Sequence, residues 1–322
     1  MYDKNLSKEF IKEFYHKKDT QRVVLALFKR LAIREEDYNK NLFNFSYDEL
    51  EDVLYYLDCT TRNALGEKLT HIYNYGKWAE DKGICKKNPF TKIDRQDYKK
   101  YFNLEKMRDQ YIRDREELYS LCDKLVNDQD KLFLVLPYEG LGSTNEILNL
   151  TKENCLVEEN DNPKRILVEG ESRRIILLTD EKSIAIIKDA KSNTLPYFVS
   201  NGDENSTAKS KVRYTLDTKY IIRATKGKGN STDIENISDI VFSYYSVGTK
   251  MKKIQAWIGK YNIIIDTIVD SGMFDRLFAL EKVKKLETDD FKEVLLFFGK
   301  NESSNQALKE NFEDYKWALE QE

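Results

Sequence analysis

Histidines, glycines, prolines and closely spaced cysteines are all scarce in this chain of 322 residues. The two histidines are His16 and His71, so any mechanism that needs a histidine after residue 71 is excluded. The nearest pair of the four cysteines, Cys59 and Cys85, lies 26 residues apart, which excludes a Cys-x-x-Cys metal knuckle. We therefore expect free thiols, no bound metal and no cofactor.

Long apolar runs are also missing. No window holds 18 consecutive uncharged apolar residues, and the N-terminal sequence MYDKNLSKEF has no apolar signal core. We therefore expect no membrane contact and a cytoplasmic location. The small number of glycines (13) and prolines (four) argues against long flexible linkers and favours a helical protein.

Charged residues make up 34% of the chain, although its net charge is only −3. Residues 1–110 carry 22 Lys and Arg against 19 Asp and Glu, a net of +3, whereas the remainder carries 31 against 37, a net of −6. This balance permits nucleic-acid binding where bases cluster on one face, because the local field governs binding.

The first third of the chain reads as helical. Apolar residues recur at three- and four-residue spacing through 4–37, and 47–58 reads as a short acidic helix. Thr60 and Thr61 can cap the next helix, and Asn88-Pro89 interrupts the chain after it. We predict a helical DNA-binding domain at residues 1–105.

The rest of the chain, 106–322, is predicted to form a second domain of mixed structure. Helices are expected at 104–127, 132–141 and 143–155, followed by a hairpin of the runs 166–170 and 173–178 and then by further helices. Residues 201–232 are polar and basic, and they read as a strand pair or an exposed insertion. The fold class is therefore mainly α with a small β-hairpin or sheet.

Three segments, in this order along the chain, resemble tyrosine recombinases of the phage integrase type. IYNYGKWAEDKGICKKNPFTKI (72–93) resembles the end of the family's core-binding domain, and PYEGLGSTNEILNLTKENC (137–155) resembles the start of its catalytic domain. SGMFDRLFAL (271–280) with FFGKNESSNQALKENFEDYK (297–316) resembles the closing helices, which carry the second arginine and the nucleophilic tyrosine. The resemblance implies a helical core-binding domain followed by an α+β catalytic-like domain.

Most positions that this family uses for cleavage hold other residues here. Such enzymes attack a phosphodiester with tyrosine, while arginines and a lysine stabilise the charge that builds on the phosphorane oxygens. The resemblance places Ser143 at the first arginine, Glu171 at the hairpin lysine, Met273 at a histidine, Lys300 at the histidine or tryptophan after a glycine, and Phe312 at the nucleophile. Arg276 keeps the second arginine. We therefore expect no catalytic residue and no cleavage of DNA.

Within the family, the chain most resembles the master repressors of SPβ-type prophages, the MrpR group. The resemblance implies sequence-specific binding to double-stranded operator DNA in a bacterial host, which silences the lytic genes and maintains lysogeny until induction. An antirepressor protein or peptide would be a further partner of such a repressor, and the sequence leaves monomer and dimer open.

Candidate DNA contacts are basic or amide side chains, because Arg and Asn can read base edges and lysines can neutralise phosphates. They are Arg62, Asn63, Lys68 and Lys77 on the helix after Thr61; Lys86, Lys87, Lys92, Arg95, Lys99 and Lys100 around Asn88-Pro89; Arg173 and Arg174 in the hairpin; and Arg276 with Lys300. Arg173 and Arg174 alternate across a strand, so only one of them can face DNA. A further basic region has an exposed disordered loop as its alternative interpretation; it comprises Lys209, Lys211, Arg213, Lys219, Arg223, Lys226 and Lys228.

Four alternatives stay open at this point. The candidates on the helix after Thr61 could simply form a solvated face. Arg276 could instead form an ion pair with Asp275 or Glu281. Tyr315, three residues after the nucleophile position, supports a divergent but active recombinase. The acidic second half of the chain also permits a protein-interaction module that has lost its affinity for DNA.

Overall fold

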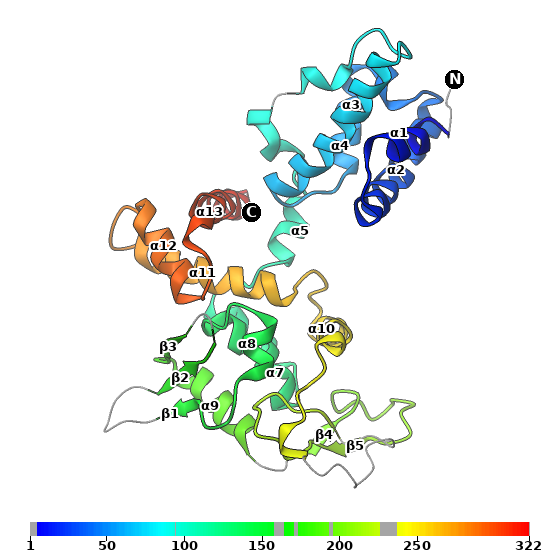
Figure 1. The fold of residues 1–322 in the computed structure, drawn as a ribbon. Coiled ribbons are helices and arrows are strands. Elements are labelled where there is room, and N and C mark those ends of the chain that lie inside the picture. Colours follow the sequence, from blue (N-terminus) through cyan, green and yellow to red (C-terminus); the bar gives the residue numbers. More distant parts are fainter. Residues whose placement is uncertain are drawn as a thin grey trace. The chain divides into compact units, whose positions relative to one another are not determined.

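A computed structural model of the chain describes residues 5–93, 95–157, 164–170, 173–192, 196–225 and 237–321, without the side chains of 95–97. The chain forms two compact units, Met1–Met107 with Asp314–Glu322, and Arg108–Glu313 (Figure 1). The predicted division at residue 105 did not anticipate that the last residues would group with the first unit, and the assignment of two domains stays a prediction.

The described ranges also bear on membranes and metals. Their four cysteines are all free. None of the helices found there combines the length and the apolar character that crossing a membrane would require. The same ranges contain no cluster of three or more His, Cys, Asp or Glu side chains that could hold a metal ion.

The first unit is helical. Its elements are α1 (Leu6–Phe14), α2 (Lys18–Tyr38), α3 (Tyr47–Tyr56) and α4 (Arg62–Asp81), the 3-10 turns Leu42–Asn44, Pro89–Lys92 and Arg95–Tyr101, and the start of α5 (Leu104–Asp109). Residues 4–37, which read as helical in the sequence, form two helices, because the chain is extended at Tyr15 and Lys17 between α1 and α2. Thr61 caps α4 as predicted, since its hydroxyl accepts the backbone N–H of Ala64 at 3.2 Å.

An aromatic core holds this unit together. Tyr75 of α4 is fully buried, and its ring lies 5.3 Å from Phe10 of α1 and 4.9 Å from Phe28 of α2, centroid to centroid. Trp78, one helical turn after Tyr75, stacks on it at 6.0 Å and donates its indole N–H to Glu13. The apolar spacing of α4 therefore fixes the packing of three helices.

Glu35 of α2 is a buried carboxyl in this core, with 1% of its surface exposed. Its Oε1 accepts the backbone N–H of Leu42 at 2.9 Å. Burial nevertheless raises the pKa of Glu35 to about 7. The folded state therefore holds this proton more tightly than the unfolded chain does.

We expect Glu35→Gln to stabilise the protein at high pH. Because the folded pKa is raised, the contribution of neutral Glu35 is fully present below pH 4.5 and is lost as the pH rises to about 7. Above that range the substitution should raise the free energy of unfolding by up to about 3 kcal/mol. Urea denaturation of both proteins at acid and alkaline pH measures this, and an equal effect of the substitution at both pH values would contradict it.

The second unit is built around one buried helix. Its helices are α6 (Arg115–Asp123), α7 (Asp128–Glu139), α8 (Thr144–Asn149), α9 (Glu181–Lys191), α10 (Tyr244–Ile258), α11 (Ile265–Glu281), α12 (Thr288–Phe297) and the first part of α13 (Asn305–Glu320), with 3-10 turns at Ile237–Asp239 and Glu302–Ser304. The residues of α13 from Asp314 on belong to the first unit. α7 is buried on nearly all sides and packs against α11 and α9 (Figure 1). This agrees with the predicted apolar helix at 132–141.

Two predicted helices of this unit are shorter in the structure. The helix predicted over 104–127 is divided into α5 and α6, because Asp114 caps a new helix by accepting the backbone N–H of Glu117 at 2.9 Å. The helix predicted over 143–155 ends at Asn149, where Leu150 becomes extended. A strand, β1 (Cys155–Val157), takes up the end of that segment.

The strands form two small antiparallel sheets. β2 (Arg165–Val168) pairs with β1 and with β3 (Arg174–Leu177), and Leu167 lies opposite Ile175. The predicted hairpin is therefore confirmed. Within 201–232 the structure has one strand, β5 (Val212–Tyr214). It pairs with β4 (Pro196–Phe198), which precedes that segment. Residues 226–236, with Lys226 and Lys228, lie outside the described residues.

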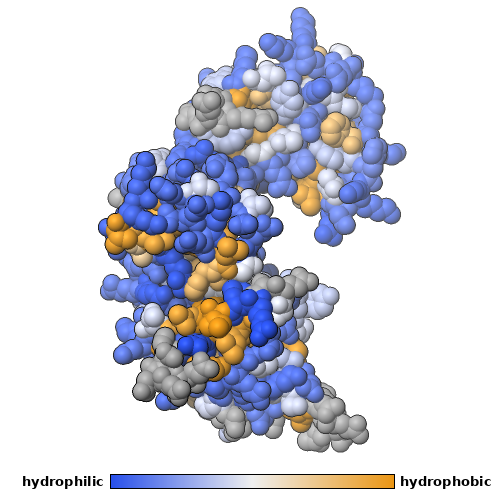
Figure 2. Space-filling model, turned by 60° about the vertical axis from the view of Figure 1, so that its left-hand side comes forward, coloured by the Kyte–Doolittle hydropathy of each residue, from blue (hydrophilic) through white to orange (hydrophobic). Residues whose placement is uncertain are grey.

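Apolar side chains also reach the surface of this unit. Ile175 and Leu177 on the outer face of β3 and Leu296 on α12 each leave about half of their surface exposed. On the face seen in Figure 2, hydrophobic residues form separate patches in a mainly hydrophilic surface. The predicted fold class, mainly α with small β elements, is confirmed.

Candidate nucleic-acid interface

The positions that resemble the recombinase active site come together within the second unit. The end of α7, the start of α8, strand β3, helix α11 and the end of α12 all meet there. Two glycines permit this approach. A Cβ on Gly142 would overlap the backbone oxygen of Phe298, and a Cβ on Gly299, which has a φ of 63°, would overlap the guanidinium of Arg174.

Ser143 stands at the first arginine position and serves as a helix cap. Its hydroxyl accepts the backbone N–H of Glu146 at 3.2 Å, and the Glu146 carboxylate accepts the backbone N–H of Gly142 at 2.8 Å. Both contacts fix the start of α8. Ser143 supplies no positive charge to the site.

Arg174 of β3 supplies the guanidinium that binds Glu146. Its two terminal nitrogens donate to the two carboxylate oxygens of Glu146 at 2.7 and 2.9 Å. It also donates to the backbone oxygen of Gly140 at 2.7 Å and to that of Phe297 at 2.8 Å. Both side chains of the ion pair are only 12% exposed. Arg174 is therefore held inside the protein, and Arg173 is the hairpin arginine with an exposed side chain.

This role of Arg174 was missed by the sequence analysis, which gave it a DNA contact. One signal was available in the sequence. Glu146 has no Lys or Arg between Leu132 and Lys152 in the chain, so a buried Glu146 needs a cation from a distant segment. The pairing across 28 residues follows from tertiary contact, which local spacing does not show.

Arg276 of α11 lies flat against an aromatic ring. Its guanidinium carbon is 3.6 Å from the ring centroid of Phe297, so the N–H donors at the guanidinium edge are not used in this contact. Burial lowers the pKa of Arg276. With the residues that the structure describes, Arg276 makes neither a hydrogen bond nor an ion pair. The alternative in which Arg276 forms an ion pair with Asp275 or Glu281 is therefore wrong.

The acidic residues near Arg276 are bound by Arg115 of α6. Arg115 donates to the two Glu139 oxygens at 2.5 and 3.2 Å and lies 3.4 Å from Asp275. Burial raises the pKa of Asp275, while Arg115 opposes that shift. Arg115 offsets one of these two negative charges, and both carboxylates still act on Arg276 electrostatically. Because neither of them accepts a hydrogen bond from Arg276, its N–H donors remain available to an anion.

Lys300 follows Gly299 at the end of α12, and its side chain lies beside Gly142. Asp270 of α11 interacts electrostatically with Lys300: burial raises the pKa of Asp270 to about 7, and Lys300 opposes this shift. Lys300 is half-buried and forms no ion pair with a described residue. It can add positive charge beside Gly142.

Packing fills the remaining positions that resemble the recombinase active site. Met273 of α11 is 3% exposed and belongs to the hydrophobic core. Phe312 of α13 is 2% exposed, and its ring lies 4.7 Å from Phe278 and 5.8 Å from Phe274. Tyr315 is 1% exposed. Glu171 lies outside the described residues.

Four predicted DNA contacts of the first unit hold its own structure together. Arg62 donates to both oxygens of Asp314 at 2.9 Å, and Lys99 lies 3.1 Å from the same carboxylate. Lys100 pairs with Glu51 at 3.0 Å. Lys68 donates to the backbone oxygen of Leu57 at 3.0 Å. For these four residues, phosphate binding would compete with internal contacts, which the sequence did not reveal.

Other candidates are available on the surface of each unit. They are Asn63, Lys77, Lys86, Lys87 and Lys92 in the first unit and Arg173 in the second, all exposed and without an ion pair to any described residue. Asn63 and Lys77 lie on one face of α4, because 14 residues make nearly four turns. The side chain of Arg95 lies outside the described residues.

Sequence reasoning also missed two lysines of α10. Lys250 and Lys253 line a cavity together with Arg213 of the predicted basic region. One signal was available, because two lysines three residues apart on a helix lie on the same face. This helix also begins with two tyrosines, Tyr244 and Tyr245.

Comparisons with known proteins show what the chain is similar to. The family models "MrpR, C-terminal catalytic domain" and "MrpR, N-terminal core-binding domain" match residues 111–316 and 1–81. The chain is 24% identical over 265 residues to the SPbeta prophage-derived uncharacterized protein YopR of Bacillus subtilis (strain 168), which covers 80% of this chain and 76% of that protein. It is also similar to a lambda integrase dimer bound to a COC′ core site, with a TM-score of 0.45, 9% identity, and coverage of 97% of this chain and 96% of that chain.

The catalytic-domain model alone spans more than half of the chain, and the core-binding model matches the helical start of the first unit. Their order along the chain is a core-binding part followed by a catalytic part. The chain belongs to the MrpR family.

Proposed function

We propose that this chain is a sequence-specific DNA-binding repressor of prophage lytic genes that maintains lysogeny in the cytoplasm of a bacterial host and does not cleave DNA. Membership of the MrpR family and the likeness to an SPbeta prophage protein support this proposal. The observation that carries it is the selective change of one site: Arg276 keeps free donors, whereas the groups needed to break a phosphodiester are replaced.

Arg276 is suited to holding a phosphate of duplex DNA. Stacking on Phe297 fixes the plane of its guanidinium, and the donors at its edge form a fork that matches two phosphate oxygens. The pair of Arg115 with Glu139 keeps the nearby carboxylate from capturing Arg276. Such a contact adds affinity without base specificity, which then falls to exposed residues such as Asn63 and Arg173.

Cleavage would need groups that this site does not offer. Phe312 has no hydroxyl, Ser143 has no positive charge, and the Arg174 guanidinium is occupied by Glu146. Removal of one charge-stabilising donor in comparable sites costs about 3–4 kcal/mol in the transition state. Loss of both the nucleophile and the first arginine therefore favours a DNA-binding role.

Band-shift titration of the full-length protein against fragments of its prophage genome tests the proposal. We expect one class of fragments to bind with a dissociation constant on the order of 10⁻⁸ M or lower, with a steep decrease at higher salt. Equal affinity for all fragments at every salt concentration would rule out sequence-specific repression.

We expect no covalent protein–DNA adduct on a nicked suicide substrate, either with the wild-type protein or with Phe312→Tyr. A hydroxyl at position 312 would lie in the packed cluster with Phe274 and Phe278, away from solvent. The first arginine that would assist this hydroxyl is also missing, because Ser143 stands at its position. Denaturing gel electrophoresis of the labelled substrate measures adduct formation.

Tyr315 provides the test of the opposite reading, an active recombinase. Its hydroxyl is the nearest in sequence to the nucleophile position, but the side chain is 1% exposed. Tyr315→Phe should therefore leave the result unchanged. An adduct with the wild-type protein that disappears in Tyr315→Phe would show that the chain is an enzyme.

A further inference from the structure

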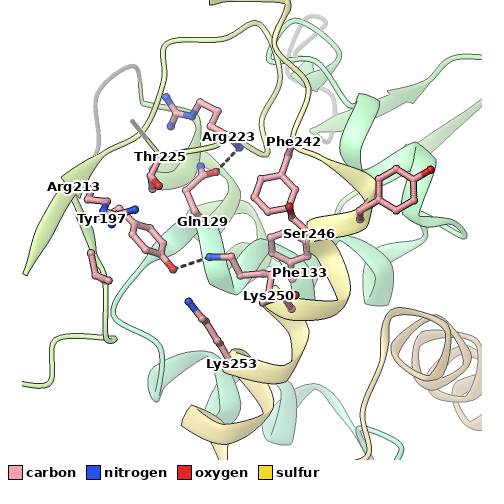
Figure 3. Close-up of a pocket in the computed structure, with 13 residues that line it drawn as sticks. Gln129, Phe133, Tyr197, Arg213, Arg223, Thr225, Phe242, Ser246, Lys250 and Lys253 are labelled. Atoms are coloured by element: carbon pink, nitrogen blue, oxygen red, sulfur yellow. Dashed lines mark hydrogen bonds between the residues drawn. The ribbon is translucent and has the colours of Figure 1, made fainter. Parts of the chain in front are cut away.

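A cavity of about 330 Å³ lies in the second unit, between α7, the β4–β5 pair and the first half of α10 (Figure 3). It is lined by 13 residues and lies within the size range of small-ligand pockets. None of the positions assigned to the former active site lines it. The chemistry of its lining is therefore a separate question.

Positive charge dominates the lining. Arg213, Arg223, Lys250 and Lys253 contribute cationic side chains, and none of the described residues that line the cavity is acidic. Arg213 and Lys253 are exposed and have no ion pair with a described residue. Cations confined to one cavity repel one another, so an anion bound between them is favoured.

One buried carboxylate orients the cluster without neutralising it. Asp130, which is fully buried, accepts from Lys250 Nζ at 2.7 Å and from the Tyr197 hydroxyl at 3.1 Å. Lys250 also donates to the Tyr197 hydroxyl at 2.6 Å, as Figure 3 shows. The single charge of Asp130 offsets one of the four cations, so the described lining keeps a net positive charge.

The floor of the cavity is fixed by Gln129. Its amide nitrogen donates to the backbone oxygens of Ala190 and Ile221 at 3.2 and 3.1 Å. Its amide oxygen accepts the backbone N–H of Arg223 at 2.8 Å, and the Arg223 guanidinium donates to Ala190. These buried contacts hold the cavity in shape before any ligand binds.

Aromatic rings line one side of the cavity. Phe242 packs edge-on against Phe133 with their centroids 5.8 Å apart. Tyr245, in the first turn of α10, is 93% exposed, so its ring contributes almost nothing to the core. An exposed aromatic ring among the lining residues of a cationic cavity offers a stacking surface for a planar base.

We propose that this cavity binds a nucleotide unit, with its phosphate against Arg213, Lys250 and Lys253 and its base against Tyr245. The same chemistry can come from a free mononucleotide or from a nucleotide of a bound DNA strand. For the second source the inference rests on the proposed DNA-binding function, and for the first it is independent of it.

The test uses the full-length protein and four variants. Arg213→Ala with Lys253→Ala removes two exposed cations, and Tyr245→Ala removes the stacking surface. Lys252→Ala is the matched control for charge, because Lys252 is exposed on the same helix but does not line the cavity. Tyr261→Ala is the control for aromaticity, since Tyr261 is 67% exposed outside the cavity.

Calorimetric titration with each deoxynucleoside monophosphate measures the first source. We expect the dissociation constant to rise about tenfold or more in the double variant and in Tyr245→Ala, as the loss of one charged contact or one base stack predicts. Both controls should match the wild type. Weaker binding of inorganic phosphate than of the nucleotide is expected because phosphate has no base to stack.

Band-shift titration with duplex DNA measures the second source. If DNA supplies the nucleotide, the double variant should lower the affinity about tenfold and the salt slope by about 0.9 for each lost phosphate contact. The proposal would be overturned if the variants bind both DNA and the mononucleotides as tightly as the wild type does. That outcome would leave the repressor function intact. Nucleotide binding without any affinity for DNA would support the cavity and contradict the repressor.

Discussion

Replacing Arg174 with methionine is expected to lower the free energy of unfolding by about 3–5 kcal/mol, because it leaves the Glu146 carboxylate buried without its cation. The loss extends beyond this pair. Arg174 also donates to the backbone oxygens of Gly140 and Phe297, so three segments of the second unit lose a shared contact. The shift of the urea denaturation midpoint measures the effect.

Two further variants separate the ion pair from other causes. Arg173→Met should change stability by about 0.5 kcal/mol or less, because Arg173 is exposed on the neighbouring position. Arg174→Met combined with Glu146→Gln should be more stable than Arg174→Met alone, since no charge then remains unpaired. Wild-type stability of Arg174→Met with weakened DNA binding would instead make Arg174 a DNA contact.

Replacing Arg276 with alanine is expected to weaken DNA binding about tenfold to a hundredfold, the range for loss of a charged hydrogen-bonded contact. The slope of log affinity against log salt should fall by about 0.9 if one phosphate contact disappears. The fold should persist, because the guanidinium contributes a stack on Phe297 worth about 1 kcal/mol and no ion pair to a described residue.

Lys285→Ala serves as the matched control for Arg276→Ala, since Lys285 is an exposed cation shortly after α11. It should bind DNA as the wild type does. Arg276→Lys should recover part of the affinity, because it keeps the charge but not the planar fork. If Arg276→Ala binds DNA with wild-type affinity at all salt concentrations, the retained arginine has no role in binding.

Local elements of the fold were accessible from the sequence. The period of apolar residues predicted α4 and α7, Thr61 gave the start of α4, and two β-branched runs predicted the hairpin of β2 and β3. Helix ends were less accessible. Asp114 caps a second helix inside a segment that reads as one continuous pattern, and α8 stops after Asn149 without a glycine or proline.

The candidate site was only partly predictable. Motif order gave Ser143, Met273, Arg276 and Phe312 their places, because those positions follow from spacing within single helices or turns. Which arginine is free did not follow. Arg174 and Arg276 each precede an apolar residue in the sequence, but one meets Glu146 and the other meets a phenylalanine ring.

The same distinction applies to the first unit. Arg62 and Lys99 look like free bases in the sequence, yet both bind Asp314, which comes more than 200 residues later. Nothing in local spacing signals such a partner, because an exposed ion pair and an unpaired base have the same sequence pattern. The structure thereby narrows the DNA-contacting candidates to side chains such as Asn63, Lys77 and Arg173.

By itself, the sequence determined which groups this protein lacks: a histidine after residue 71, an arginine at position 143, where Ser143 stands, and a hydroxyl at position 312, where Phe312 stands. These are absences of functional groups, and no fold can supply them at those positions. Only the tertiary structure decided which of the remaining charges are free, because pairing depends on the few ångströms between segments distant in the chain. It bound Arg174 to Glu146 and left the donors of Arg276 open.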